Sequence, residues 1–271
     1  MADLPSTHEV RVIPMKHVAP RTLEPAQASL NRAMMTDSLE RFTAGTSHVI
    51  NNLMTCVLGY SELIMLKLPE DSPCVEYLRN IEQAAGQAAD LCQRMATYAG
   101  KGRYVIVPHD INVLTGDFFL LLQSMFRDKA DMYWRSTWDL PKVGLDATRY
   151  RQALMEVVLN AVEAGGARRN RIWISARMTH LDRAKLDSLI GGRGLCEGMY
   201  VAVEVRDTGT GMDAATKDRM FDPFFSTKSA SQGMGLSMVQ GIMRRMAGAV
   251  AVRSEPGKGT AVEMFFPPAP V

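Results

Sequence analysis

The fold of this chain is decided by four short stretches. They are Glu-Val-Val-Leu-Asn-Ala (Glu156–Ala161), Asp-Thr-Gly-Thr-Gly-Met (Asp207–Met212), Phe-Asp-Pro-Phe-Phe-Ser-Thr-Lys (Phe221–Lys228) and Gly-Met-Gly-Leu-Ser (Gly233–Ser237). Each stretch alone is a weak signal, because glycine pairs and helical amides are common. Together and in this order, they indicate one shared pocket, built from distant parts of the chain.

The first stretch supplies a candidate metal site. Glu156 and Asn160 are four residues apart on an expected helix, Tyr150–Ala164, so they share one face, which we expect to lie opposite the buried face. Magnesium prefers oxygen ligands and keeps several waters, so the Asn160 amide oxygen plus nucleotide phosphates would suit it. Glu156, a candidate catalytic residue, would hold a metal-bound water. Alone, this pair could equally be an exposed polar face.

The second stretch supplies a candidate adenine site. Asp207 follows an expected strand, Met199–Arg206, and falls on the same inward side as the alternating valines of that strand. A buried carboxylate needs hydrogen-bond donors, and an adenine amino group is one. Gly209 and Gly211 would let the backbone approach a flat ring closely. A turn with an aspartate cap is the plain alternative for this segment in isolation.

The last two stretches supply candidate phosphate ligands. Lys228 follows an aromatic run that includes Phe225, and its mobile ammonium can reach a phosphate. Gly233 and Gly235 precede an apolar helix beginning at Leu236. Such a loop offers bare amides and a helix N-terminus to a polyphosphate.

The surrounding pattern predicts an α+β sandwich from residue 108 to residue 268. Apolar residues at helical spacing predict a further helix, Leu114–Phe126, and the helix after the glycine loop extends to Met246. Alternating or β-branched residues predict four strands, at Arg171–Met178, Met199–Arg206, Ala249–Ser254 and Ala261–Phe266.

Residues 37–103 carry a different pattern, that of an antiparallel helical hairpin. Apolar residues in steps of three and four form two seams, separated by Pro69 and Pro73. The seams are Ile50, Leu53, Val57, Tyr60 and Ile64, then Leu78, Ile81, Ala85, Ala88, Cys92, Met95 and Ala99. A lone hairpin leaves apolar surface open, so we expect a homodimer with a four-helix bundle. Residues 1–36 contain four prolines and predict an irregular tail, too short for a usual sensory domain.

Taken together, the four stretches closely resemble the ATP-binding domain of the histidine kinases, in which they are the N box, the F box and two G boxes. The resemblance runs from about Pro108 to Pro267 and implies the Bergerat fold, shared with DNA gyrase, a heat-shock chaperone family and the mismatch-repair ATPases. It implies Asn160 for Mg²⁺, Asp207 for adenine, and Lys228 with the glycine loop for phosphates. Thr260 then corresponds to the threonine that supports the adenine-binding aspartate.

The hairpin extends this resemblance. Thr-Ser-His-Val-Ile-Asn-Asn-Leu-Met, followed by Leu-Gly-Tyr-Ser-Glu-Leu, is similar to the phosphoacceptor helix of kinases related to the nitrogen-regulation sensor. The resemblance implies that His48 is phosphorylated from ATP and passes the phosphoryl group to a response-regulator receiver domain. The seam independently predicts that His48 lies on the outward face, with Asn52 one turn along. In related proteins the residue at the Asn52 position helps to dephosphorylate the partner.

Three departures from the family pattern keep alternatives open. Val49 stands where the family has an acid, Glu156 stands where these kinases commonly have asparagine, and the phosphate loop lacks its leading glycine. The first departure favours a kinase-impaired phosphatase or phosphotransfer protein, or an ATP-gated scaffold. The second favours a stand-alone Bergerat ATPase, whose glutamate activates water.

Composition limits the expected cellular location and partners of the protein. A net charge of +2 gives no broad nucleic-acid footprint. The four cysteines have no metal or disulfide spacing, and no apolar run is long enough to span a membrane. We therefore expect a cytoplasmic protein with no membrane or nucleic-acid partner, and a separate sensor protein as a possible partner.

Overall fold

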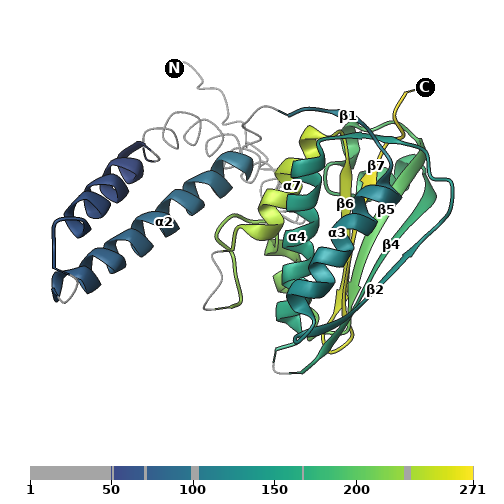
Figure 1. Cartoon of the computed structure of the whole chain (residues 1–271). Coiled ribbons are helices and arrows are strands. Elements are labelled where there is room, and N and C mark those ends of the chain that lie inside the picture. Colours follow the sequence, from purple (N-terminus) through teal and green to yellow (C-terminus); the bar gives the residue numbers. More distant parts are fainter. Residues whose placement is uncertain are drawn as a thin grey trace, which may run out of the picture. The chain divides into compact units, whose positions relative to one another are not determined.

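The computed structural model describes residues 50, 52–69, 72–98, 104–166, 168–228 and 233–270. They form a helical hairpin and an α+β domain (Figure 1). The predicted tail and His48 lie outside the described residues. No described helix has the length and apolar content needed to cross a membrane.

The hairpin consists of a helix at residues 52–65 and the antiparallel helix α2 (Cys74–Tyr98), as the sequence predicted (Figure 1). Pro69 and Pro73 both lie in the connection, where the amide of Ser72 donates to the Pro69 carbonyl over 3.0 Å. Buried positions recur at helical spacing along α2, at Leu78, Ala85 and Cys92. The second predicted seam is therefore buried at these three positions, whereas Ile81 of the same seam is 45% exposed.

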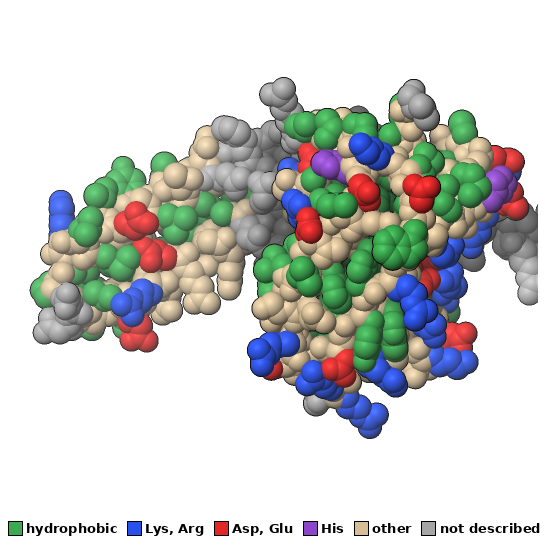
Figure 2. Space-filling view, turned by 45° about the vertical axis from the view of Figure 1, so that its right-hand side comes forward, with side chains coloured by type: hydrophobic (Ala, Val, Ile, Leu, Met, Phe, Trp, Pro, Cys, Tyr) green, Lys and Arg blue, Asp and Glu red, His purple; other side chains and the backbone are tan. Residues whose placement is uncertain are grey.

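The first predicted seam lies on the outside of the hairpin. Leu53 is 56% exposed, Tyr60 68% and Ile64 47%. In the same helix Ser61 is buried. Along the hairpin, hydrophobic side chains lie open on the face seen in Figure 2.

The α+β domain is built on a five-stranded sheet in the order β2-β4-β5-β7-β6. β2 pairs with β4 in parallel, and the other pairs are antiparallel. The strands are β2 (Ala130–Ser136), β4 (Asn170–Leu181), β5 (Gly198–Asp207), β6 (Ala249–Glu255) and β7 (Gly259–Phe266). A separate two-stranded sheet joins β1 (Val107–His109) and β3 (Val143–Leu145).

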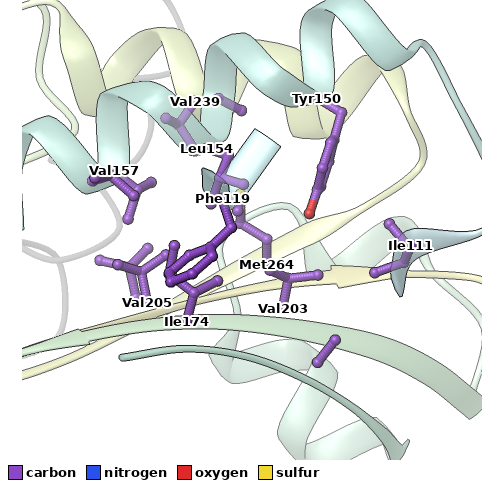
Figure 3. Packing of buried hydrophobic residues seen from close by; sticks show 14 of the residues in the cluster. Ile111, Phe119, Tyr150, Leu154, Val157, Ile174, Val203, Val205, Val239 and Met264 are labelled. Carbon is purple, nitrogen blue, oxygen red and sulfur yellow. The ribbon is translucent and has the colours of Figure 1, made fainter. Parts of the chain in front are cut away.

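Three helices cover one face of the larger sheet (Figure 1). They are α3 (Ile111–Phe126), α4 (Ala147–Ala164) and α7 (Gly235–Arg245). Asp110 and Asp146 cap the first two of these helices by accepting hydrogen bonds from first-turn amides. Figure 3 shows Phe119, Leu154 and Val239 directed from the helices toward the sheet. Val201, Val203 and Val205 are all buried in this core, as the period of two predicted for β5.

The other face of the sheet is partly covered by the segment between β4 and β5. This segment holds α5 (Arg183–Ser188) and the short 3-10 helix η1 (Gly192–Gly194). Leu186 and Leu189 pack there with Tyr200 and Phe265 in a second buried cluster. The remaining short helix, α6 (Ala214–Arg219), follows the second stretch.

Candidate nucleotide site

One cavity contains residues from all four stretches. It lies beside α4, the end of β5, residues 225–228 and the start of α7. The predicted site residues that line it are Asn160, Asp207, Gly211, Phe225, Lys228, Gly233, Gly235, Leu236 and Thr260. Glu156 and Gly209 lie directly behind this lining and are described below.

Asp207 is held by backbone donors at the end of β5. The residue is only 4% exposed, and its Oδ1 accepts hydrogen bonds from the Gly209 amide at 2.7 Å and the Thr260 amide at 3.3 Å. Burial raises the pKa of Asp207 above its usual value, while these bonds and one from the Asn170 side chain act to lower it. A fixed, largely desolvated acceptor of this kind can recognise an amino group on a flat ring.

Asn170 is part of this arrangement, and the sequence analysis missed it. It is buried at the start of β4 and donates from Nδ2 to the Ala161 carbonyl of α4 at 2.7 Å. Its Oδ1 accepts from both the amide and the hydroxyl of Thr208, at 3.1 and 2.7 Å. Asn170 therefore ties α4 to the residue after Asp207. A single asparagine before a strand carries no pattern that would have revealed this role.

Thr260 connects the aspartate to the sheet edge. Its Oγ1 lies 2.8 Å from Oγ of Ser254, which also accepts from the Met212 amide at 2.8 Å. The second stretch is thereby attached to both β6 and β7. Thr260 thus contacts Asp207 by its amide and the neighbouring strand by its hydroxyl.

The two glycines of the second stretch permit close backbone packing. A Cβ at Gly209 would lie 2.6 Å from Cβ and 2.7 Å from the carbonyl oxygen of Ala164. Gly211 has a φ of 67°, and a Cβ there would collide with the Glu255 carbonyl. These glycines are needed for backbone contact as well as for the shape of the cavity.

Gly211→Ala is expected to lower the free energy of unfolding by about 2–4 kcal/mol, because left-handed strain adds to a clash with backbone that cannot rotate away. Chemical denaturation with and without ATP would measure this loss. Gly257→Ala is the matched control, since Gly257 has a φ of 75° but no atom within 4 Å of the added Cβ. That control should lose only about 1–2 kcal/mol. Equal losses in the two variants would contradict the packing argument.

Glu156 differs from its prediction. It is buried, only 9% exposed, whereas the sequence analysis placed it with Asn160 on an exposed face. The reason is the start of α7, since a Cβ at Gly235 would lie 2.8 Å from Glu156 Oε2 and 3.6 Å from Asn160 Nδ2. A side chain at Gly235 would therefore displace the Glu156 carboxylate.

The side-chain oxygens near Gly235 could bind Mg²⁺ together with phosphate oxygens. The Glu156 carboxylate and the Asn160 amide are near the same point, and both offer the hard oxygens that Mg²⁺ prefers. α7 begins there, and its N-cap residue Met234 makes no side-chain capping bond. First-turn amides at such an end suit a phosphate. The arrangement therefore fits a metal-bound polyphosphate.

Lys228 lies at the edge of the cavity in an ion pair. Its Nζ is 2.8 Å from Oε2 of Glu163 on α4. Phe225 lies nearby in the lining, and the guanidinium of Arg219 is 4.2 Å from the centre of its ring. Asn52, the other predicted catalytic residue that is described, has an exposed side chain at the start of the helix at residues 52–65.

Comparison with known proteins identifies the family. Residues 145–270 match the family described as histidine kinase-, DNA gyrase B-, and HSP90-like ATPases. Over 233 residues, 84% of the chain, the sequence is 30% identical to the sensor kinase CckA of Brucella abortus (strain 2308). Over 91% of the chain it is 25% identical to the sensor histidine kinase ZraS of Klebsiella oxytoca. Residues 145–270 therefore form an ATP-binding domain of this family, and most of the chain is similar to sensor histidine kinases. The chain spans 24% of the length of CckA and 50% of that of ZraS.

Solved histidine kinases share its fold. Full-length ShkA in complex with AMPPNP gives a TM-score of 0.64 at 24% identity, over 85% of this chain and 47% of ShkA. ThkA in complex with the response regulator TrrA gives 0.51 at 19% identity, over 93% of this chain and 68% of that one. The predicted α+β fold, with helices followed by a mixed sheet, is confirmed.

Proposed function

We propose that this chain transfers the γ-phosphoryl group of ATP to His48 and then to an aspartate of a response regulator. The observation that carries the proposal is the cavity in which Asn160, Asp207, Lys228 and the start of α7 come together. Their donors and acceptors match the two ends of ATP. The sequence around His48 supplies the acceptor.

Each group has a separate task in this proposal. Asp207 accepts a hydrogen bond from the adenine amino group, and its two backbone donors keep the carboxylate in place. The first-turn amides of α7 and the Lys228 ammonium bind phosphate oxygens. Asn160 would supply an amide oxygen to Mg²⁺, and the buried Glu156 would hold a water bound to the metal. Magnesium, when bound, would offset phosphate charge, and the chain itself contributes mainly position.

The chemical step forms one bond and breaks another. A nitrogen of the neutral His48 imidazole attacks the γ-phosphorus while the bond to the bridging oxygen of ADP breaks, and the imidazole proton passes to water. Val49 offers no carboxylate to take that proton. General-base assistance is typically worth about 10²–10⁴ in rate, so we expect slow labelling. The ThkA complex with TrrA supports a receiver domain as the next acceptor.

Incubation of the purified chain with γ-labelled ATP and Mg²⁺ tests the proposal. The expected product carries acid-labile, base-stable label, as a phosphorus–nitrogen bond requires. A protein that binds ATP but is never labelled would support the ATP-gated scaffold. Release of labelled inorganic phosphate without any labelling of the protein would support the stand-alone ATPase.

We also propose that two copies associate through the exposed seam of the hairpin. Leu53, Val57, Tyr60 and Ile64 recur in steps of three and four on one side of the helix, and Tyr77 and Ile81 of α2 are exposed as well. A second hairpin would bury this stripe in a four-helix bundle. The buried Ser61 lies on the neighbouring side of the helix, turned roughly 70° from the middle of this stripe.

The double variant Leu53→Glu, Ile64→Glu is expected to be monomeric, because carboxylates cannot be buried unpaired in such a bundle. Sedimentation equilibrium should show at least a hundredfold loss of dimer affinity, from roughly 3 kcal/mol of lost burial. Gln83→Glu is the control, since Gln83 is exposed and turned about 200° from Ile81 on α2. Dimerisation that survives the double variant would exclude this face.

A further inference from the structure

The ammonium of Lys228 is shared with a carboxylate that no stretch of the site contains. Lys228 Nζ lies 2.8 Å from Oε2 of Glu163, and the two side chains are 39% and 37% exposed. Glu163 stands on α4 three residues after Asn160, so the two project from neighbouring positions of the helix. The ion pair therefore holds Lys228, the candidate phosphate ligand, against the helix that carries Asn160, the candidate metal ligand.

This ion pair opposes phosphate binding in two ways. An ammonium has three N–H donors, and a donor directed at Glu163 is not available to a phosphate oxygen. A carboxylate at this edge of the cavity also repels the negative charges of a triphosphate. Because both side chains are more than a third exposed, water screens these effects and keeps them modest.

We propose that Glu163 competes with the nucleotide phosphates for Lys228 and so weakens the binding of MgATP and of its product. The inference rests on the proposed function, since it takes Lys228 as a phosphate ligand. Glu163 is a positioning residue in this scheme, acting through Lys228 without touching the reacting atoms. By weakening both complexes, Glu163 speeds the exchange of ADP for ATP between successive phosphoryl transfers to His48.

Glu163→Gln removes the charge and keeps the size of the side chain. Calorimetry should show a Kd for MgATP that is about two- to fivefold lower than that of the wild-type chain, within the range of a half-exposed ion pair. The difference should shrink as salt is raised to about 1 M. Glu255→Gln is the control for net charge, because Glu255 forms an exposed 2.6 Å ion pair with Lys258. It should leave the Kd unchanged.

The decisive comparison repeats Glu163→Gln in a Lys228→Ala background. If Glu163 acts through Lys228, Glu163→Gln no longer increases the affinity for MgATP in that background. A gain of equal size without the lysine would show general charge repulsion and overturn the inference, as would an unchanged or higher Kd for Glu163→Gln alone. If the natively folded wild-type chain binds no MgATP, the nucleotide site itself is refuted and this inference falls with it.

Discussion

His48→Ala is expected to abolish acid-labile labelling from γ-labelled ATP while leaving the Kd for MgATP within about twofold. The physical reason is that an alanine has no nitrogen to attack phosphorus, whereas the residues that line the cavity come from positions 157–262. Labelling followed by acid and alkali treatment, with calorimetry on the same preparation, measures both quantities. Loss of label with unchanged affinity would separate the acceptor from the nucleotide site.

His180→Ala is the matched control, because His180 is an exposed histidine on β4 outside the cavity lining. It should label at the wild-type rate. Persistent acid-labile label in the His48 variant would contradict the assignment of the acceptor. Continued release of free phosphate by that variant, at the wild-type rate, would favour an ATPase.

Much of the fold could be predicted because burial in it follows simple periods. β5 alternates valines toward the helices, and α4 repeats its apolar residues at helical spacing. The predicted boundaries were short by a few residues where capping decides them, as at Asp110 before α3 and Asp146 before α4. β2 was missed because it lies at the sheet edge, where the charged Asp131 and Arg135 break the apolar run.

The candidate site was predictable to the extent that glycine reports backbone contact. The glycines at positions 209, 211 and 235 indicate in the sequence that the chain passes close to other groups there. The structure identifies those groups as Ala164, the Glu255 carbonyl and the Glu156 side chain. The burial of Glu156 was not predictable, because it depends on α7, which arrives from about 80 residues later in the chain. Asn170 and Glu163 were missed for the same reason, since their partners are distant in sequence.

Asp207→Asn is expected to raise the Kd for MgATP roughly 30- to 1,000-fold, corresponding to about 2–4 kcal/mol for a buried, charge-assisted hydrogen bond. The carboxylate offers two acceptor oxygens, and Oδ1 is already occupied by the amides of Gly209 and Thr260. If the amide oxygen of the variant stays on those donors, its NH₂ group faces the adenine amino group. Two donors then meet in a place that water reaches poorly.

Asp182→Asn provides the control for this substitution. Asp182 caps α5 by accepting from the Lys185 amide at 2.7 Å, outside the cavity lining, and asparagine caps helices equally well. It should change neither the Kd nor the midpoint of thermal unfolding. The Asp207 variant should also remain folded, because removing a negative charge from a site that burial makes unfavourable for it does not by itself destabilise the chain. A folded Asp207→Asn variant that binds MgATP within threefold of wild type would remove adenine recognition from this residue, since no other change in that variant touches the cavity.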